Sequence, residues 1–205
     1  MYDGFMLKAS TKSLVAEFLG TLVLTSLVIV ALKVPNFSSP AGLAALVVGL
    51  FVYTVGHISG AQFNPAVTIG LWLIGKMEVT DAVKFGMIQM IAAWSGASLI
   101  GWLIPVSHSL MVDNSLQTGL VEAMGTFIFC FGIASVVVGK VDKAASGIVV
   151  GLSLFLGSAV SLTTANGVLN PAVAFGIGSW GMPYIWGPIV GGVLGFKVYK
   201  WLIAS

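Results

Sequence analysis

The stretch GVLNPAVAFG, residues 167–176, contains the triplet Asn170-Pro171-Ala172, and the same triplet occurs at Asn64-Pro65-Ala66. A valine follows each copy, Val67 in the first and Val173 in the second. Asparagine is a good N-cap, and proline is favoured at the first position of a helix, where its missing N–H is not needed. Each triplet therefore predicts the start of a helix, and the repetition predicts two starts with related roles.

The composition is that of a membrane protein. Of the 205 residues, 58% are hydrophobic and only 8% are charged, and the mean hydropathy is +1.04. Soluble domains carry about 25% charged residues, so this chain has too few charges to cover a surface that faces water. The formal net charge of +2 is too small to indicate a nucleic-acid partner. The single cysteine, Cys130, stands in an apolar run, so we expect an apolar packing role for it and no disulfide within the chain.

Six segments are long and apolar enough to cross a hydrocarbon core of about 30 Å, which takes about 20 residues of helix. These predicted spans are residues 13–33, 40–57, 80–104, 118–139, 144–162 and 183–203. Two further apolar stretches, 64–75 and 170–180, begin at the two triplets. A helix of about 11 residues, at about 1.5 Å per residue, covers only about half the membrane. We therefore expect two half-length helices.

The basic residues predict the orientation in the membrane. All nine are lysines, and the sequence has no arginine. Lys8, Lys12, Lys197 and Lys200 lie near the two ends of the chain. Lys76 and Lys84 lie between the second and third spans, and Lys140 and Lys143 lie between the fourth and fifth. Only Lys33 falls on the opposite side. Because basic loops stay in the cytoplasm, we expect a multi-pass protein of the cell membrane with both termini cytoplasmic.

A second repeat indicates two related halves. The segment Glu17-Phe18-Leu19-Gly20-Thr21 in the first span is echoed by Glu122-Ala123-Met124-Gly125-Thr126 in the fourth, at an offset of 105 residues. The two triplets are 106 residues apart. Each half holds three spans and one half-length helix, and because three is odd, the second half enters the membrane from the opposite face. We expect a single channel domain over residues 1–205, formed by a first repeat, 1–105, and an inverted second repeat, 106–205.

The inverted arrangement brings the two half-length helices together. Non-helical backbone at membrane depth is tolerated only inside protein or along a water-filled cavity, so each segment must enter as a loop and start its helix near the midplane. Both helix N-termini, each with about half a positive charge, then meet there with the amides of Asn64 and Asn170. Such a site favours an uncharged molecule with a lone pair and repels cations and protons.

The string GHISGAQFNPAVTIG, residues 56–70, together with the second triplet and the paired glutamates of AEFLGT and VEAMGT, resembles the aquaporin or major intrinsic protein family over essentially the whole chain. The resemblance implies an all-α, aquaporin-like membrane protein with six transmembrane helices and two re-entrant half-helices in an inverted repeat. It further implies one pore per subunit, a homotetramer in membrane lipid, and passage of water and small neutral solutes. Neither a cofactor, a bound metal nor an enzymatic activity is implied.

The resemblance also assigns roles to polar residues. The family's pore motif is represented by Asn64, Pro65, Ala66, Asn170, Pro171 and Ala172. Glu17 and Glu122 resemble its buried glutamates, which brace the re-entrant loops; a carboxylate inside a membrane needs partners, and loop N–H groups are good ones. A proton-relay pair is the functional alternative. His57, in the Gly-His-Ile-Ser-Gly turn, resembles the pore-lining histidine of the cytoplasmic side, or is a turn histidine bonded to nearby carbonyls. His108 lies in the outer loop, where we expect it to be solvated.

The outer constriction departs from the family pattern. Most members have an arginine directly after the second triplet, and three other positions complete this selectivity filter. By spacing, the four filter positions are Ala44, Ser158, Gly167 and Val173. Water-selective members usually place an aromatic residue at the first and a histidine at the second, so this chain loses bulk and a fixed positive charge. We expect a ring wider than one water molecule unless Phe51, Leu169 or Phe175 fills it.

A small, Ser/Gly-lined ring resembles that of members that pass bulky neutral solutes, such as silicic, boric or arsenious acid. The leading expectation is a passive channel for water and small uncharged solutes, with neutral metalloid or arsenical acids as candidates. The alternative is a plain water or glycerol channel whose filter residues have diverged from the family pattern without a change of substrate. An ion-coupled transporter is a further one, because inverted repeats and broken helices also occur in transporters. No paired Asp, Ser/Lys or His-rich motif supports an intramembrane enzyme.

Overall fold

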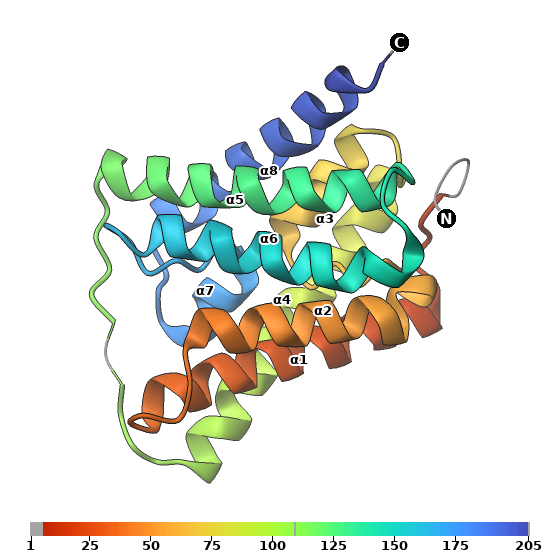
Figure 1. Cartoon of the computed structure of the whole chain (residues 1–205). Coiled ribbons are helices and arrows are strands. Elements are labelled where there is room, and N and C mark those ends of the chain that lie inside the picture. Colours follow the sequence, from red (N-terminus) through yellow and green to blue (C-terminus); the bar gives the residue numbers. More distant parts are fainter. Residues whose placement is uncertain (1–5, 109, 205) are drawn as a thin grey trace.

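The computed structural model describes residues 6–108 and 110–204, and the regular structure of this part of the chain is helical, without a β-strand (Figure 1). The helices are α1 (Thr11–Lys33), α2 (Pro40–Ser59), α3 (Pro65–Leu73), α4 (Val79–Leu103), α5 (Leu116–Val137), the short 3₁₀-helix η1 (Lys143–Ala145), α6 (Ser146–Ser161), α7 (Pro171–Ile177) and α8 (Pro183–Leu202). Every predicted span and both half-length segments are helices, so the predicted element order is confirmed.

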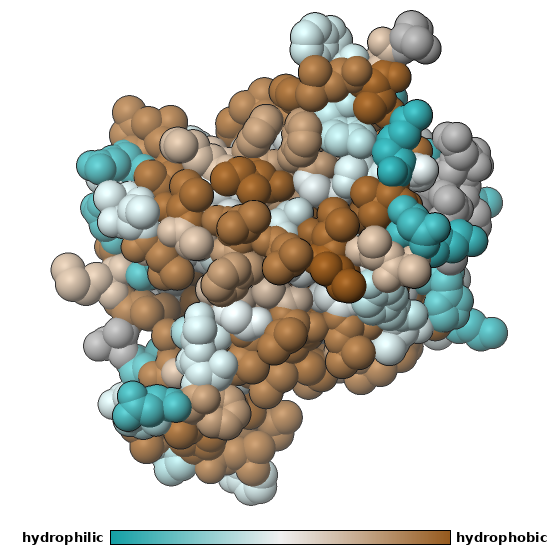
Figure 2. Space-filling model, viewed as in Figure 1, coloured by the Kyte–Doolittle hydropathy of each residue, from teal (hydrophilic) through white to brown (hydrophobic). Residues whose placement is uncertain are grey.

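Five helices in the described residues are long and apolar enough to cross a membrane: α1, α2, α4, α5 and α6 with its preceding 3₁₀ turn. The sixth, α8, is long enough at 20 residues but carries Lys197 and Lys200 near its end and falls outside that set. Figure 2 shows brown, apolar residues across the middle of the molecule and teal, hydrophilic residues gathered towards the two ends of the helices. This distribution suits a bundle that crosses a bilayer.

Serine caps start three of the spanning helices. Ser10 and Ser13 form a reciprocal capping box at α1, and the hydroxyls of Ser39 and Ser115 accept the N–H groups of Gly42 and Thr118. Each cap satisfies a donor that the first helical turn leaves free. The boundaries of these helices therefore follow from local sequence chemistry.

Small residues allow the long helices to lie close together. A Cβ atom added to Gly49 of α2 would lie 2.8 Å from the carbonyl oxygen of Gly147 at the start of α6, and one added to Gly187 of α8 would lie 2.5 Å from that of Gly119 in α5. Close backbone approach at small residues is how helices associate in lipid, where the hydrophobic effect gives little drive. Cys130 is fully buried in α5 against α8, as expected for an apolar packing residue.

Each half-length helix packs against a long helix of the other half of the chain. In the first half, α1 packs against α2 and α4; in the second, α5 packs against α6 and α8. However, α3 lies on α8, where Gly70 accommodates the ring of Phe196, and α7 lies on α4, where Gly176 approaches the backbone of Ala93. Neither half therefore completes its own packing alone.

Candidate pore and its lining

The two triplets start α3 and α7 as the sequence predicts. The side-chain oxygen of Asn64 accepts the N–H of Ala66 at 2.9 Å, and that of Asn170 accepts the N–H groups of Ala172 and Val173 at 3.0 and 3.3 Å. Both asparagines have extended backbone, and the following prolines occupy the first helical positions. The amide oxygens are thus committed to capping their own helices.

The amide nitrogens of the same asparagines reach across to the other half. Asn64 Nδ2 donates to the carbonyl oxygen of Leu169 at 2.8 Å, and Asn170 Nδ2 donates to that of Phe63 at 2.8 Å. An amide nitrogen carries two N–H donors, so one on each asparagine has no protein partner among the described residues. Both asparagines line the same cavity, so the groups that they can offer to its contents are donors.

Glu17 holds the loop that precedes the first triplet. One of its carboxyl oxygens accepts the hydroxyl of Ser59 at 2.6 Å and the N–H of Gln62 at 2.9 Å; the other accepts the N–H of Phe63 at 2.7 Å and the side-chain amide of Gln89 at 2.8 Å. The residue is fully buried. Every contact presents a donor to the carboxylate, as an unpaired charge in a membrane requires.

Glu122 makes the matching contacts in the second half. It accepts the hydroxyl of Ser161 at 2.7 Å and the N–H groups of Val168 and Leu169 at 3.1 and 2.8 Å. No hydrogen bond in the described part of the chain joins the two carboxylates, and each holds the loop of its own half. This geometry suits loop bracing better than a proton relay.

The residue before each asparagine fits into a glycine of the glutamate-bearing helix. The ring of Phe63 covers Gly20, and Leu169 sits between Gly125 and Gly157, where a Cβ added to Gly125 would lie 2.6 Å from its Cδ2 atom. Both residues are fully buried and have left-handed backbone, with φ of 50° and 55°. That conformation costs an L-residue about 1–2 kcal/mol, and the glutamate bonds to the same loops offset it. Neither contact was anticipated from the sequence, although Glu-x-x-Gly occurs in both halves.

One cavity brings the candidate filter and both asparagines together. It has a volume of ≈ 150 Å³, room for several water molecules, and is lined by Ala44, Ser158, Gly167, Val173, Asn64 and Asn170 among others. Apolar side chains from α1, α2, α5 and α6 form most of the rest, including Leu24, Val28, Val48, Phe129 and Leu154. Lysine, arginine, aspartate and glutamate are absent from this lining among the described residues.

The three bulky side chains considered as possible fillers are held elsewhere. Phe51 stacks edge-on against Phe63 with ring centres 5.5 Å apart, and Phe175 against Trp180 at 5.2 Å. Leu169 is packed against the two glycines of α5 and α6 described above. None of the three lines the cavity, so none of them covers the four small residues at the candidate filter positions.

Two polar residues of the lining were missed at the sequence level. Gln62 is buried, and its side-chain oxygen accepts the hydroxyl of Thr68 at 2.7 Å. Asn166 donates through Nδ2 to the carbonyl oxygen of Met111 at 3.0 Å and also to the Ser179 hydroxyl. Both stand in the loops before the triplets, at two and four residues from the asparagines, and that position was the available signal.

A second, smaller cavity of ≈ 30 Å³ is lined by Val52, Ile133 and Val150 among others. These three stand one helical turn from Val48, Phe129 and Leu154 of the larger cavity, and we call the six residues the apolar layer. The two cavities share no lining residue in the described part of the chain. A path between them must pass this one-turn apolar layer.

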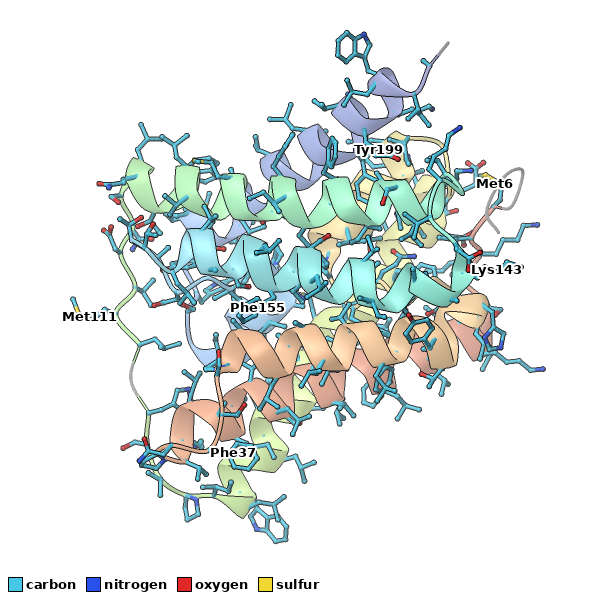
Figure 3. All side chains as sticks on the ribbon, in the orientation of Figure 1. Met6, Phe37, Met111, Lys143, Phe155 and Tyr199 are labelled. Atoms are coloured by element: carbon cyan, nitrogen blue, oxygen red, sulfur yellow. The ribbon has the colours of Figure 1, made fainter. Side chains whose placement is uncertain are left out.

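The position of His57 differs in part from the prediction. It is exposed in the last turn of α2 rather than in the turn itself, which follows at the left-handed Gly60. Gly60 takes a left-handed conformation with φ of 91°, which ends the helix, so the helical turn extends as far as Ser59. His57 lines a cavity of ≈ 280 Å³ with Tyr53, Lys143 and Ser146, and Figure 3 shows Lys143 at the same end of the molecule as Met6. It therefore lies near the end of α2, whereas the candidate filter residue Ala44 lies near the start of the same helix.

The expectation that His108 is simply solvated is wrong. Its Nε2 atom lies 3.1 Å from the carbonyl oxygen of Ile177, the last residue of α7, and the side chain is half-buried. Carbonyls at a helix C-terminus lack intrahelical donors, and a histidine N–H is one way to satisfy them. His108 is thus tied to the re-entrant helix.

The described residues hold no group of three or more His, Cys, Asp or Glu side chains that could bind a metal ion. The only ion pair among them joins Lys84 to Asp81 at 3.3 Å, in the first turn of α4. The chemistry available in the cavity is therefore that of hydrogen-bond donors, a serine hydroxyl and apolar surface.

The comparisons with known proteins cover nearly the whole chain and agree with one another. The profile of the major intrinsic protein family matches residues 6–199. Aquaporin Z of Photorhabdus laumondii is 30% identical over 231 residues, which cover 95% of this chain and 98% of that protein. Aquaporin A of Dictyostelium discoideum is 30% identical over 219 residues, which cover 94% and 78%. The structure of the aquaglyceroporin from Plasmodium falciparum superposes with a TM-score of 0.68 over 93% of this chain and 94% of that one; at 24% identity it supports the fold alone.

Proposed function

The chain belongs to the major intrinsic protein family and is therefore a passive membrane channel for water or small solutes, and we propose that its outer ring admits bulky uncharged molecules. Neutral metalloid or arsenical acids are the solutes that we propose first. The path would run through the cavity at Asn64 and Asn170, then across the apolar layer to the mouth at His57.

One observation carries this proposal. The four filter positions line a single cavity with both asparagines, and their side chains are a methyl group, a hydroxymethyl group, a hydrogen and an isopropyl group. The aromatic, histidine and arginine side chains that would narrow such a ring are absent at these positions, and Phe51, Leu169 and Phe175 do not line the cavity. A wide ring with few fixed polar groups discriminates weakly by size.

The electrostatics favour neutral solutes. The helix N-termini at Asn64 and Asn170 carry partial positive charge, and each amide offers a donor to the cavity. A neutral acid accepts these hydrogen bonds through its oxygens, whereas a cation would have to exchange its hydration shell for donors. We propose that cation exclusion depends on this pair, since no arginine supplies a further fixed charge.

Further features are proposed on the same basis. Glu17 and Glu122 would brace the two re-entrant loops, and residues 1–105 and 106–205 would form the two inverted repeats of one channel domain. The lysine distribution supports a cell-membrane protein with both termini cytoplasmic. The family relationship supports a homotetramer with one pore in each subunit.

Proteoliposomes test the proposed solutes. Stopped-flow light scattering would compare the entry of water, glycerol and arsenious acid into vesicles with and without the protein. We expect all three to enter faster with the protein, and Val173→Arg to slow arsenious acid more than water because it adds both bulk and charge. Val173→Leu adds bulk alone and is the matched control.

The alternatives predict different results. A plain water channel would leave arsenious acid entry at the rate of protein-free vesicles, and a channel selective for glycerol would admit glycerol much faster than arsenious acid. An ion-coupled transporter would show solute flux that depends on a sodium or pH gradient. If Val173→Arg changes no solute flux while water flux is normal, the filter has been assigned to the wrong residues.

A further inference from the structure

The loop between α4 and α5 contributes one residue to the cavity that holds the candidate filter. Leu110 of this loop lines the same cavity as Ala44, Ser158, Gly167 and Val173. Its side chain is half-buried and is larger than any of those four. Leu110 is not one of the four filter positions, so the filter assignment leaves it without a role.

The cavity ends in a layer of larger apolar side chains. Ser158 and Leu162 of the lining are four residues apart at the end of α6, and Val173 and Ile177 are four residues apart at the end of α7. Four residues are about one helical turn, so an apolar residue lies about 6 Å beyond each of these two filter residues. Leu32 lines the cavity from the last turn of α1. Three helices therefore end at this layer.

The loop is attached to this layer on both sides of Leu110. The Nε2 atom of His108 lies 3.1 Å from the carbonyl oxygen of Ile177, and the carbonyl oxygen of Met111 accepts Nδ2 of Asn166 at 3.0 Å. Asn166 precedes α7 and Ile177 ends it, so the two attachments lie at either end of the second re-entrant segment. They keep Leu110 next to the segment that supplies two of the four filter residues. We call the outer layer the apolar rim, formed by Leu32, Leu110, Leu162 and Ile177.

A lysine of α1 fixes the start of the same loop. Lys33 Nζ donates to the carbonyl oxygen of Ile104 at 2.9 Å and also to that of Val106. Hydrogen bonds from a charged donor are about twice as strong as those between neutral groups. The loop is thus held before Leu110 as well as around it, and its position depends on two separate parts of the chain.

The apolar rim can select by size but not by hydrogen bonding. Its four side chains carry neither a donor nor an acceptor. The ring one turn further in has small side chains, so the rim supplies bulk where the ring lacks it. Leu110 is the rim residue that a loop positions, since the other three stand at helix ends. Its place in the entrance therefore depends on the attachments of the loop.

We propose that Leu110 is a further size-determining residue of the channel, and that His108 and Asn166 are positioning residues that hold it in the entrance. The proposal rests on the proposed function, because it takes the cavity as the solute path. A neutral solute would pass Leu110 before it reached the ring. The narrower of the two levels would then set the largest solute that enters.

A size series of uncharged solutes tests the role of Leu110. Stopped-flow light scattering of proteoliposomes would give the permeabilities to water, ethylene glycol, glycerol and erythritol. We expect Leu110→Ala to raise the ratio of erythritol to ethylene glycol permeability about tenfold and Leu110→Trp to lower it, since a misfit of one methylene group in a close-fitting site changes selection by at least about that factor. Met111→Ala is the matched control and should leave the ratio unchanged. Met111 is the next residue, but its side chain is 91% exposed, and Figure 3 shows it pointing away from the helices.

A double variant tests whether His108 acts through Leu110. His108→Ala should raise the same ratio because it releases one side of the loop, whereas His108→Gln keeps an N–H donor for Ile177 and should stay near wild type. Adding His108→Ala to Leu110→Ala should raise the ratio no further, since the bulk that His108 positions is already gone. A full additional rise would overturn the positioning role.

The Val173→Arg variant separates this proposal from the proposed function. If Val173→Arg changes solute flux while both Leu110 variants leave the ratio unchanged, the ring is assigned correctly and the proposal for Leu110 is overturned. An equal rise with Met111→Ala and Leu110→Ala also overturns it, because loosening of the loop would then be the cause. If no variant at Val173 or Leu110 changes any flux, the proposed function fails and this proposal fails with it. Exclusion of arsenious acid together with a shifted ratio supports Leu110 and overturns only the metalloid acids as solutes.

Discussion

Replacement of Asn170 by aspartate tests how this chain excludes cations. The substitution keeps an oxygen that can cap α7, but it removes the Nδ2 donor that lies 2.8 Å from the carbonyl oxygen of Phe63. It also places a negative charge where the starts of α3 and α7 meet. We expect the protein to fold and to conduct protons and small cations.

The size of the effect follows from the charges at this point. Two helix N-termini contribute about one positive charge together. A cation at about 4 Å from one unit charge is repelled by about 4 kcal/mol at an effective dielectric constant of about 20. A carboxylate cancels that charge, so cation flux should rise by up to about a thousandfold. The lost bond to Phe63 leaves a buried carbonyl without its donor, at a cost of about 1–3 kcal/mol in stability.

A proton-leak assay in proteoliposomes measures the change. Vesicles loaded with a pH-sensitive dye would be exposed to an acid pulse, with valinomycin to hold the membrane potential. Asn170→Ala removes the amide without adding charge, and Asn166→Asp adds a carboxylate to the same cavity away from the helix starts. Both controls should leak much less than Asn170→Asp.

Two results would refute the reasoning. If Asn170→Asp leaks no more than Asn170→Ala, charge at this position does not govern cation passage. If Asn166→Asp leaks equally, a carboxylate anywhere in the cavity is sufficient and the meeting point of the helices has no special role. In either case water flux must stay normal, since a collapsed cavity would also stop the leak.

Three further predictions concern stability, read as melting temperature in detergent. Glu122→Gln should lower the free energy of unfolding by about 1–3 kcal/mol, because a buried N–H such as that of Leu169 loses its acceptor; an unchanged melting temperature would contradict this bracing role. Gly125→Ala should cost about 1–3 kcal/mol by overpacking, whereas Gly86→Ala, with nothing within 4 Å, should be neutral or stabilising; equal effects would contradict the steric argument. Hydrogen bonds from Ser115 and Thr118 lower the pKa of Asp113, so its stabilising contribution is present above about pH 4 and is lost as the pH falls through the lowered pKa. The difference between wild type and Asp113→Asn should therefore disappear in acid, and a constant difference would count against it.

The sequence predicted the elements of this fold well because membrane insertion imposes simple requirements. A span needs about 20 apolar residues, so six segments could be identified from composition alone. The starts of α3 and α7 were also predictable, since Asn and Pro have definite preferences at helix N-termini. The ends were less certain: the predicted stretch ran to residue 180, but α7 stops at Ile177, where the left-handed Gly178 closes it.

The contacts around the loops were not predictable in the same way. Phe63 and Leu169 act through their backbone carbonyls and left-handed φ values, and a single sequence gives no signal for which carbonyl will face which amide. The error for His108 has a similar origin. Its partner, the carbonyl oxygen of Ile177, is 69 residues away in the chain, and only the folded structure brings the two together.

The two halves are alike where glutamates hold the loops and differ at the candidate filter. Ser161 follows Ser59 by 102 residues and makes the same bond to its glutamate, but Leu169 follows Phe63 by 106 residues, so the second loop is four residues longer. That longer loop supplies Asn166 and Gly167 to the cavity lining. The first loop has no length for such residues and contributes Gln62 instead. The repeat thus accounts for the paired asparagines, and the extra length of one loop accounts for why the candidate filter lies on one side of them only.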